Sequence, residues 1–267
     1  MLEHHTDPLT QLIDAILPAG GRVSGELAEE SGATIKALIP LRGETLLERE
    51  IHALRETGCM GRIVVIGPPE LQDHEAARGA DIVLHEGSDG PENIFRGLEW
   101  LQAQKNAARR VLVVTTDLPF LRPQALTQFI EMCSPELDIC VPVIERREYE
   151  AVFPDAPGVW MRLQDGEWAI GCAFLLNAPA LQKSRPHLEA AFAARKSPIG
   201  MARLLGPQFI MRFLFKRLTI AHILQRCRRG LGCTGEPIRG CAPELAYDID
   251  EVAEYRYAVQ HTQRTSS

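Results

Sequence analysis

The sequence predicts an α/β protein with a three-layer α/β/α, Rossmann-like architecture and a mainly parallel central sheet. Short apolar runs typical of strands alternate with amphipathic helical segments, and turn residues separate them. One run, residues 111–114 (Val-Leu-Val-Val), is apolar without interruption, as in a strand covered by helices on both faces. Crossovers between parallel strands are almost always right-handed, so a doubly wound layered sheet is the expected arrangement.

The regular alternation lies in the first part of the chain. The pattern predicts strands over residues 13–17, 62–66, 81–85, 110–115 and 139–143, and helices over 45–57, 92–105 and 123–132. In the first of these helices, the apolar residues at positions 46, 47, 51 and 54 share one face, and Gly58 follows its end. Pro123 suits the first position of the third helix, where a missing backbone N–H costs nothing.

After residue 144 the pattern is less regular. We expect strands over 160–163, 168–176 and 245–249, and helices over 188–195, over 219–229 and from about 251. No internal repeat with a period of about 20–50 residues is visible. We therefore interpret residues 1–267 as a single domain.

Composition limits the class of protein. The chain has 267 residues, of which 45% are hydrophobic and 24% charged, so it can bury a large core and is not disordered. No apolar run approaches the roughly 18 residues needed to span a membrane, and the first residues lack the pattern of a signal peptide. We expect a cytoplasmic protein with no membrane partner.

The seven cysteines include no C-x-x-C pair and are odd in number, which argues against a disulfide scaffold. Cys227, Cys233 and Cys241 lie loosely grouped near His222, but their spacing fits no usual zinc site. We expect reduced, partly buried thiols.

Charge is unevenly distributed along the chain, whose formal net charge is −6. Residues 185–239 contain eleven Lys and Arg against two acidic residues. A basic segment in an acidic protein indicates a local anionic partner rather than general nucleic-acid binding. The alternative is a set of solvated helix faces.

Two glycines follow the first predicted strand, in the segment Pro18-Ala19-Gly20-Gly21-Arg22. Glycine permits a loop in which successive backbone N–H groups point at one anion, and the end of a strand is where open α/β sheets bind ligands. A Walker loop aligned on Gly20 and Gly25 would need lysine at position 26, which is glutamate, and no G-x-G-x-x-G is present. The absence of both motifs argues against a P-loop ATPase and against a simple dinucleotide dehydrogenase. The alternative for the two glycines is a plain turn.

Two aspartates are candidates for a metal site. Asp117 follows the predicted strand over 110–115, where its carboxylate could hold Mg²⁺; alternatively, it orients the turn before Pro119. Asp250 ends the segment Asp248-Ile249-Asp250 at the last predicted strand–helix junction, and in a strand residues 248 and 250 share a face. Asp250 could complete the metal site opposite Asp117, or could cap the closing helix.

Taken in order, these motifs resemble the MobA-like nucleotidyltransferase family, which includes relatives of the molybdenum-cofactor nucleotidyltransferases and of sugar-phosphate cytidylyltransferases. The matching motifs are Gly20-Gly21, the segment over 35–41 with Lys36, Gly43-Glu44-Thr45-Leu46-Leu47-Glu48, Gly90-Pro91-Glu92-Asn93, Asp117-Leu118-Pro119-Phe120 and Asp248-Ile249-Asp250. The resemblance implies a GT-A-like nucleotidyltransferase fold. Residues 12–144 would form the nucleotide-binding half of the domain, and 145–250 the acceptor side.

The resemblance also implies an activity: Mg²⁺-dependent transfer of NMP from an NTP to a small-molecule acceptor, often a phosphate, with release of pyrophosphate. Ala19, Gly20, Gly21 and Arg22 would hold the triphosphate, and Lys36 would lie against the phosphates. Gly90 and Asn93 match positions that contact the base or ribose. Asp117 and Asp250 match the metal ligands. By this resemblance Lys36, Asp117 and Arg22 form the catalytic set.

One departure from the family pattern concerns an arginine. The family's loop usually continues Gly-Gly-x-x-x-Arg-Met-Gly, whereas this chain has Arg22-Val23-Ser24-Gly25-Glu26 after the two glycines. If Arg22 does not substitute for that arginine, the chain could be a nucleotide-binding protein without turnover. A nucleotide-sugar glycosyltransferase is a further alternative, because Asp248-Ile249-Asp250 has the D-x-D form, although it lies close to the C-terminus.

Lys216 and Arg217 precede a predicted helix that Thr219 could cap. They could clamp an acceptor phosphate, or they could extend from an amphipathic surface to solvent. The sequence predicts no oligomeric state.

Overall fold

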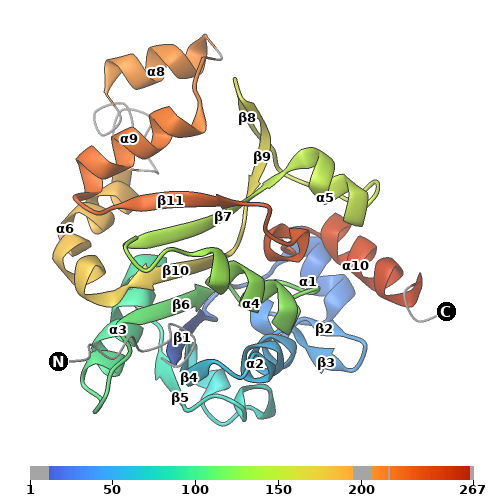
Figure 1. Cartoon of the computed structure of the whole chain (residues 1–267). Helices are drawn as coiled ribbons and strands as arrows, with labels where there is room; N and C mark the ends of the chain where they lie inside the picture. The colour runs from blue at the N-terminus through green and yellow to red at the C-terminus, as the bar shows by residue number, and fades with distance from the viewer. Residues whose placement is uncertain (1–11, 195–205, 216, 265–267) are drawn as a thin grey trace.

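A nine-stranded sheet forms the centre of the molecule, which is described here from a computed structural model over residues 12–194, 206–215 and 217–264 (Figure 1). Its first part is parallel and runs β5-β4-β1-β6. These strands are β5 (Ile82–His85), β4 (Met60–Gly67), β1 (Ile13–Pro18) and β6 (Arg110–Val114). All four were predicted from their apolar runs, with ends within two residues.

The second part of the chain continues the same sheet in the order β10-β7-β9-β8, with β11 beside β7. The strands are β7 (Ile139–Glu145), β8 (Met161–Leu163), β9 (Gly166–Ile170), β10 (Ala173–Asn177) and β11 (Gly235–Arg239). β10 is antiparallel to β6 and to β7, whereas β11 is parallel to β7. Both halves of the chain therefore share one mostly parallel sheet, and the predicted fold class is confirmed. A separate small ladder pairs β2 (Pro40–Leu41) with β3 (Glu44–Thr45).

Helices cover both faces of the sheet. α2 (Leu46–Glu56) and α4 (Pro123–Met132) lie over one face, and α3 (Gly90–Gln102) and α6 (Ala178–Ala194) over the other. β1 shows the alternation that this requires, because Ala15 and Leu17 pack in the α2 and α4 cluster while Ile16 packs in the α3 and α6 cluster. α2 starts at a capping box, in which Thr45 and Glu48 satisfy each other's backbone N–H groups.

A third cluster of side chains lies around α1 (Gly25–Ser31), α5 (Arg146–Val152) and α10 (Val252–Arg264). Its centre is aromatic: the rings of Phe120, Phe153 and Tyr247 have centroids 4.7–5.0 Å apart. This cluster attaches the C-terminal segment to the loop after β6. α8 (Pro207–Leu214) and α9 (Ile220–Leu231) lie beyond β11, on the opposite side of the molecule from α10 (Figure 1).

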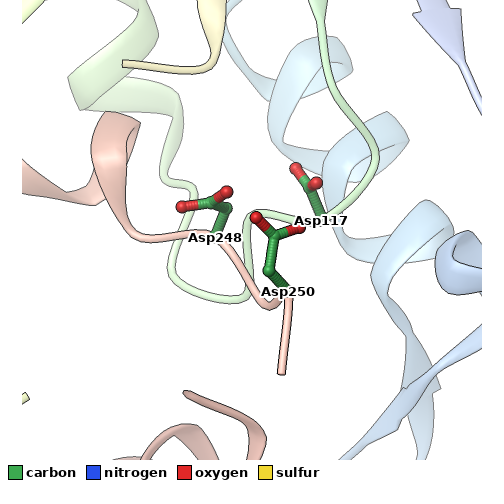
Figure 2. A group of neighbouring side chains, drawn as sticks. All are labelled: Asp117, Asp248 and Asp250. Carbon is green, nitrogen blue, oxygen red and sulfur yellow. The ribbon is translucent and has the colours of Figure 1, made fainter. Parts of the chain in front are cut away.

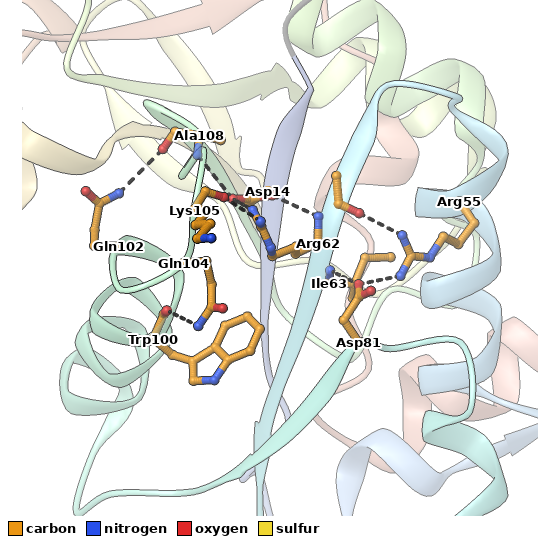
Figure 3. Close-up of polar contacts among 11 residues, drawn as sticks. Asp14, Arg55, Arg62, Ile63, Asp81, Trp100, Gln102, Gln104, Lys105 and Ala108 are labelled. Atoms are coloured by element: carbon orange, nitrogen blue, oxygen red, sulfur yellow. Dashed lines mark hydrogen bonds and ion pairs between the residues drawn. The ribbon is translucent and has the colours of Figure 1, made fainter.

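A buried aspartate organises the amino ends of the strands. Asp14 is 2% exposed, and its carboxylate accepts hydrogen bonds from the backbone N–H groups of Arg62 (2.8 Å) and Ala108 (3.3 Å) (Figure 3). Nearby, the carboxylate of Asp81 accepts from the backbone N–H of Ile63 (2.7 Å) and from the guanidinium of Arg55 (2.6 Å). Both aspartates satisfy backbone groups at sheet edges, so their role is structural.

Three predictions for the second half are corrected. The single strand expected over 168–176 is two strands, β9 and β10, with an interruption at Gly171-Cys172. There the N–H of Cys172 donates to the carbonyl of Leu245 (2.7 Å) and not to a neighbouring strand. The strand expected over 245–249 is instead a 3-10 helix, η5 (Pro243–Ala246), followed by an extended segment without strand pairing. The helix expected from 188 begins ten residues earlier, at Ala178.

Further described elements were not predicted: the helices α1, α5 and α8, the strands β2, β3 and β11, and three short 3-10 helices over residues 36–38, 69–71 and 75–77. Within the part of the chain that the structure describes, no helix has both the length and the apolar character needed to cross a bilayer.

Candidate active site

The order of the strands creates a crevice between β1 and β6. After β1 the chain passes through α2 to β4 on one side, and after β5 it returns through α3 to β6 on the other side of β1. The loops that follow β1 and β6 therefore diverge at the carboxyl edge of the sheet. This is the topological switch point at which open α/β sheets bind ligands.

The glycine loop after β1 forms one wall of the crevice. The N–H of Ala19 donates to the carbonyl of Ile66 (2.6 Å), and the carbonyl of Gly21 accepts from the N–H of Lys36 (2.9 Å). A Cβ atom at Gly20 would lie 2.1 Å from Oε2 of Glu86, so a larger residue would displace that side chain. The loop is thus closely packed, and it is tied directly to the segment that carries Lys36.

Asp117 lies opposite the glycine loop, directly after β6. The hydroxyl of Thr115 donates to Oδ1 of Asp117 (2.6 Å), and the hydroxyl of Thr116 donates to the carbonyl of Pro18 (3.1 Å). These two bonds orient the Asp117 carboxylate and join its loop to the end of β1. The side chain of Asp117 is only 13% exposed.

The C-terminal segment brings two more carboxylates to Asp117. The N–H of Ile249 donates to the carbonyl of Asp117 (3.1 Å). As a result Asp248 and Asp250 approach Asp117, and one oxygen from each of the three side chains lies within 4.8 Å of the others (Figure 2). The convergence expected for Asp117 and Asp250 is therefore observed. Asp248 was not predicted as a third member, although its D-x-D spacing from Asp250 was the available signal.

Lys36 lies between two of these carboxylates. Its ammonium donates to Oδ2 of Asp117 (2.7 Å) and to Oδ1 of Asp250. Burial opposes the charge of Lys36, but the two carboxylates outweigh burial and raise its pKa above the ordinary lysine value. Lys36 is therefore fully charged at neutral pH.

One lysine does not neutralise three carboxylates. Burial, followed by the charges of Asp117 and Asp250, raises the pKa of Asp248 to about 6. Carboxylate oxygens are the ligands that Mg²⁺ prefers, so the donor set fits a hard divalent cation.

Glu50, on α2, is a buried acid behind the cluster that was not predicted. One of its oxygens accepts from the N–H of Leu118 (2.9 Å), whereas Oε2 has no hydrogen-bond partner among the described residues. Burial raises the pKa of Glu50 well above its ordinary value, in spite of that hydrogen bond. A signal was available: Glu50 is four residues after Leu46 and four before Leu54, so it lies on the apolar stripe of the predicted helix.

Of the two residues expected to contact base or ribose, Asn93 lies next to the glycine loop. Asn93, 6% exposed, accepts from the N–H of Gly87 (2.6 Å), and its side-chain nitrogen would be 3.5 Å from a Cβ at Gly20. Gly90 is the first residue of α3, whose N-cap is Asp89. Arg22 also lies here, and its guanidinium donates to Glu86 (2.9 Å) and to the carbonyl of Gly20 (3.2 Å).

Two basic residues were suggested for an acceptor phosphate. Lys216 lies outside the described residues. Arg217 precedes Leu218, whose carbonyl accepts from the N–H of Gln164 (2.8 Å) in the turn between β8 and β9. β9 runs from that turn toward Cys172, so Arg217 is separated from the carboxylates by the length of the strand.

A cleft opens on the side of Asp248 and Asp250 away from the glycine loop. It has a volume of about 520 Å³, and we call it the aromatic cleft because Tyr149, Trp160 and Trp168 line it together with those aspartates. Two of the three carboxylates, Asp248 and Asp250, therefore line the aromatic cleft. Lys36 connects Asp117 and Asp250 to the glycine loop.

A glycine loop beside carboxylates at the switch point of a doubly wound sheet defines a class of enzymes that bind nucleotide phosphates. A family model for the MobA-like NTP transferase domain matches residues 15–228, so the chain belongs to this family and is a nucleotidyltransferase.

Solved structures of similar fold include several transferases. A hypothetical transferase from Thermus thermophilus is 29% identical, with a TM-score of 0.78 over 91% of this chain and 99% of that chain. A nucleotidyl transferase from Methanothermobacter thermautotrophicus is 19% identical, with a TM-score of 0.58 and coverage of 95% and 99%. The 2-C-methyl-D-erythritol 4-phosphate cytidylyltransferase from Thermus thermophilus is 17% identical, with a TM-score of 0.54 and coverage of 95% and 100%. The last two likenesses show a shared fold.

Proposed function

We propose that this protein transfers NMP from an NTP to a small-molecule acceptor. An acceptor oxygen attacks the α-phosphorus, and the bond from that phosphorus to the oxygen bridging to the β-phosphate breaks. The electron pair leaves with pyrophosphate. Such a reaction needs in-line placement and charge neutralisation more than covalent catalysis by the protein.

The residues around the switch point would bind different parts of the nucleotide. Backbone N–H groups of the glycine loop, together with Arg22, bind the triphosphate. Asn93 lies beside that loop, and Asn93 and Gly90 would border the base and ribose. The backbone N–H of Lys36 donates to the carbonyl of Gly21 in the glycine loop, and its ammonium donates to the Asp117 carboxylate. From this position the ammonium can stabilise the negative charge that develops on the phosphates.

Asp117, Asp250 and Asp248 would hold a magnesium ion, which supplies positive charge to the α-phosphate and to the departing pyrophosphate when it is bound. Thr115 orients the Asp117 carboxylate for this purpose. Lys36 donates to Asp117 and Asp250 from the same position and would direct its ammonium to the nucleotide phosphates.

The observation that carries the proposal is the hydrogen bond from Ile249 N–H to Asp117 C=O. It draws carboxylates from residues 117, 248 and 250 together at the switch point, between the glycine loop and the aromatic cleft.

The decisive experiment measures pyrophosphate release with ATP, GTP, CTP and UTP in turn, with Mg²⁺ and a panel of phosphorylated and hydroxylated acceptors. We expect one NTP to support release that depends on both Mg²⁺ and an acceptor. Nucleotide binding with no release for any combination would instead favour a binding protein that lacks turnover. Preference for an intact UDP-sugar over every free NTP would favour a glycosyltransferase.

A further inference from the structure

The aromatic cleft has a chemical character that limits its ligand. Among its described lining residues, the ionisable side chains other than Tyr149 and Cys172 are all acidic: Asp248, Asp250, Glu251 and Glu254. No described lysine, arginine or histidine lines it. The nearby Lys36, Arg146 and Arg239 contact lining residues, at Asp250, Trp160 and Trp168 respectively. A second anionic group deep in this cleft would therefore meet mainly carboxylates, which repel it.

The same cleft offers apolar surface. Val159 and Ile170 both line it and are 89% and 53% exposed. Trp160, Met161 and Trp168 add further apolar area to the walls. Large apolar side chains left open to water beside a reactive site are suited to contact the apolar body of a ligand.

A second cavity extends this apolar surface beneath α9. Its volume is about 260 Å³, and its walls include Val141 and Val143 of β7 and Ile223 and Leu224 of α9. Met161 and Ile170 line both the aromatic cleft and this cavity, so the two spaces share a wall. Methionine has a flexible side chain, and movement of Met161 would join them.

We propose that the acceptor has an apolar body, which lies in the aromatic cleft and extends toward the cavity beneath α9, with its one reactive oxygen-bearing group at the carboxylates. The position of the reactive group depends on the proposed nucleotidyl transfer; the apolar character of the body does not. The combined space is of the size found for small-molecule sites, which is about 300–1,000 Å³.

The test begins with binding and needs no nucleotide. The neutral dye N-phenyl-1-naphthylamine is titrated against the full chain, and fluorescence is compared for wild type, Ile170→Glu and Leu12→Glu. Leu12 is a matched control because it is 56% exposed and precedes β1, away from the cleft. We expect saturable binding to wild type and to Leu12→Glu, and at least tenfold weaker binding to Ile170→Glu. Val159→Glu, at a more exposed position, provides a second variant if Ile170→Glu fails to fold.

Competition identifies the ligand class. Octyl phosphate should displace the dye, whereas glucose 1-phosphate should not. Absence of dye binding to wild type, or equal binding to all variants, would overturn the proposal, as would displacement by glucose 1-phosphate alone. If dye binding depends on Ile170 but no NTP yields pyrophosphate, the ligand class stands and the transfer reaction fails.

With the active NTP identified, octyl phosphate should stimulate pyrophosphate release by wild type and by Leu12→Glu, but at least tenfold less by Ile170→Glu. Equal stimulation of wild type and Ile170→Glu by glucose 1-phosphate would show that an acceptor without an apolar body is used, and would overturn the proposal.

Discussion

The N–H of Ile249 donates a 3.1 Å hydrogen bond to the carbonyl oxygen of Asp117, across 132 positions of the sequence. This bond fixes the D-x-D segment relative to the end of β6. The side chains on either side of Ile249 therefore face the Asp117 carboxylate, and the geometry of the carboxylate cluster depends on backbone pairing rather than on the side chains alone.

Asp117→Asn should abolish Mg²⁺-dependent pyrophosphate release and leave the fold intact, because the amide keeps the shape but loses the charge. Asp14→Asn is the matched control: Asp14 is also a buried aspartate, but it bonds backbone N–H groups at the amino edge of the sheet. It should lower the free energy of unfolding by about 1–3 kcal/mol and retain turnover in the folded protein. Urea unfolding measures the stability of both variants, and the pyrophosphate assay measures their turnover. Wild-type turnover in Asp117→Asn would show that Asp117 is not part of the active site.

Lys36→Ala should have opposite effects on the two ligands. Loss of a charged hydrogen-bond donor should weaken NTP binding by about 1–3 kcal/mol. Removal of the cation that pairs with Asp117 and Asp250 should at the same time strengthen binding of Mn²⁺ in the absence of nucleotide. Calorimetric titration measures the affinity for NTP and the affinity for Mn²⁺ in separate experiments. Lys36→Met, which keeps the stem that packs on Gly21, separates packing from charge; unchanged NTP affinity in both variants would contradict the assignment.

Glu86→Gln should strengthen NTP binding. Arg22 is paired with Glu86 in the structure, and this partly exposed ion pair would compete with a triphosphate for the guanidinium. An exposed pair is worth about 0–1 kcal/mol, so the gain should not exceed about fivefold. The gain should disappear in the double variant with Arg22→Ala. If Glu86→Gln binds NTP no better than wild type, Arg22 does not take the place of the missing loop arginine.

Glu50→Gln should flatten the dependence of stability on pH. The folded-state pKa of Glu50 is raised above its unfolded value of about 4.5, so its contribution to stability is complete below that value and is lost as pH rises through the folded pKa. Glutamine cannot ionise, and the variant should become more stable relative to wild type as pH increases from 5 to 8. Asp248, with a pKa raised to about 6, gives a similar slope in both proteins and cancels in the comparison.

Glu50→Leu tests the role of Glu50 as hydrogen-bond acceptor for the backbone N–H of Leu118. Leucine leaves the N–H of Leu118 without a partner in the interior, which should cost about 1–3 kcal/mol at every pH. Urea unfolding over the pH series measures both variants. A parallel pH profile for wild type and Glu50→Gln would mean that Glu50 is not held protonated.

The first half of the fold could be predicted from the sequence because three of its four strands, β1, β4 and β6, are largely buried. β1, β4 and β6 are largely apolar runs, and the helices between them carry ordinary start and stop signals. Asp117 could be predicted for the same reason, since it follows shortly after such a run. Lys36 and Asn93 were found through the family resemblance, not through periodicity.

The second half was less predictable because its elements depend on distant partners. β11 contains Pro237 and a single buried apolar residue, Ile238, and it exists because β7 offers a free edge. The break between β9 and β10 depends on Leu245, more than 70 residues later. A strand was expected over residues 245–249, but Pro243 starts a 3-10 helix that includes the first two of them. Asp248 therefore reaches the cluster from an extended segment, not from the strand that was expected.

The sequence position of the D-x-D segment has a consequence for biosynthesis. Every strand of the described sheet precedes Asp248 in the chain, so a ribosome completes the glycine loop, Lys36 and Asp117 well before it adds the last two carboxylates. If the three carboxylates hold a divalent ion as proposed, that site is complete only once residue 250 has been added to the chain.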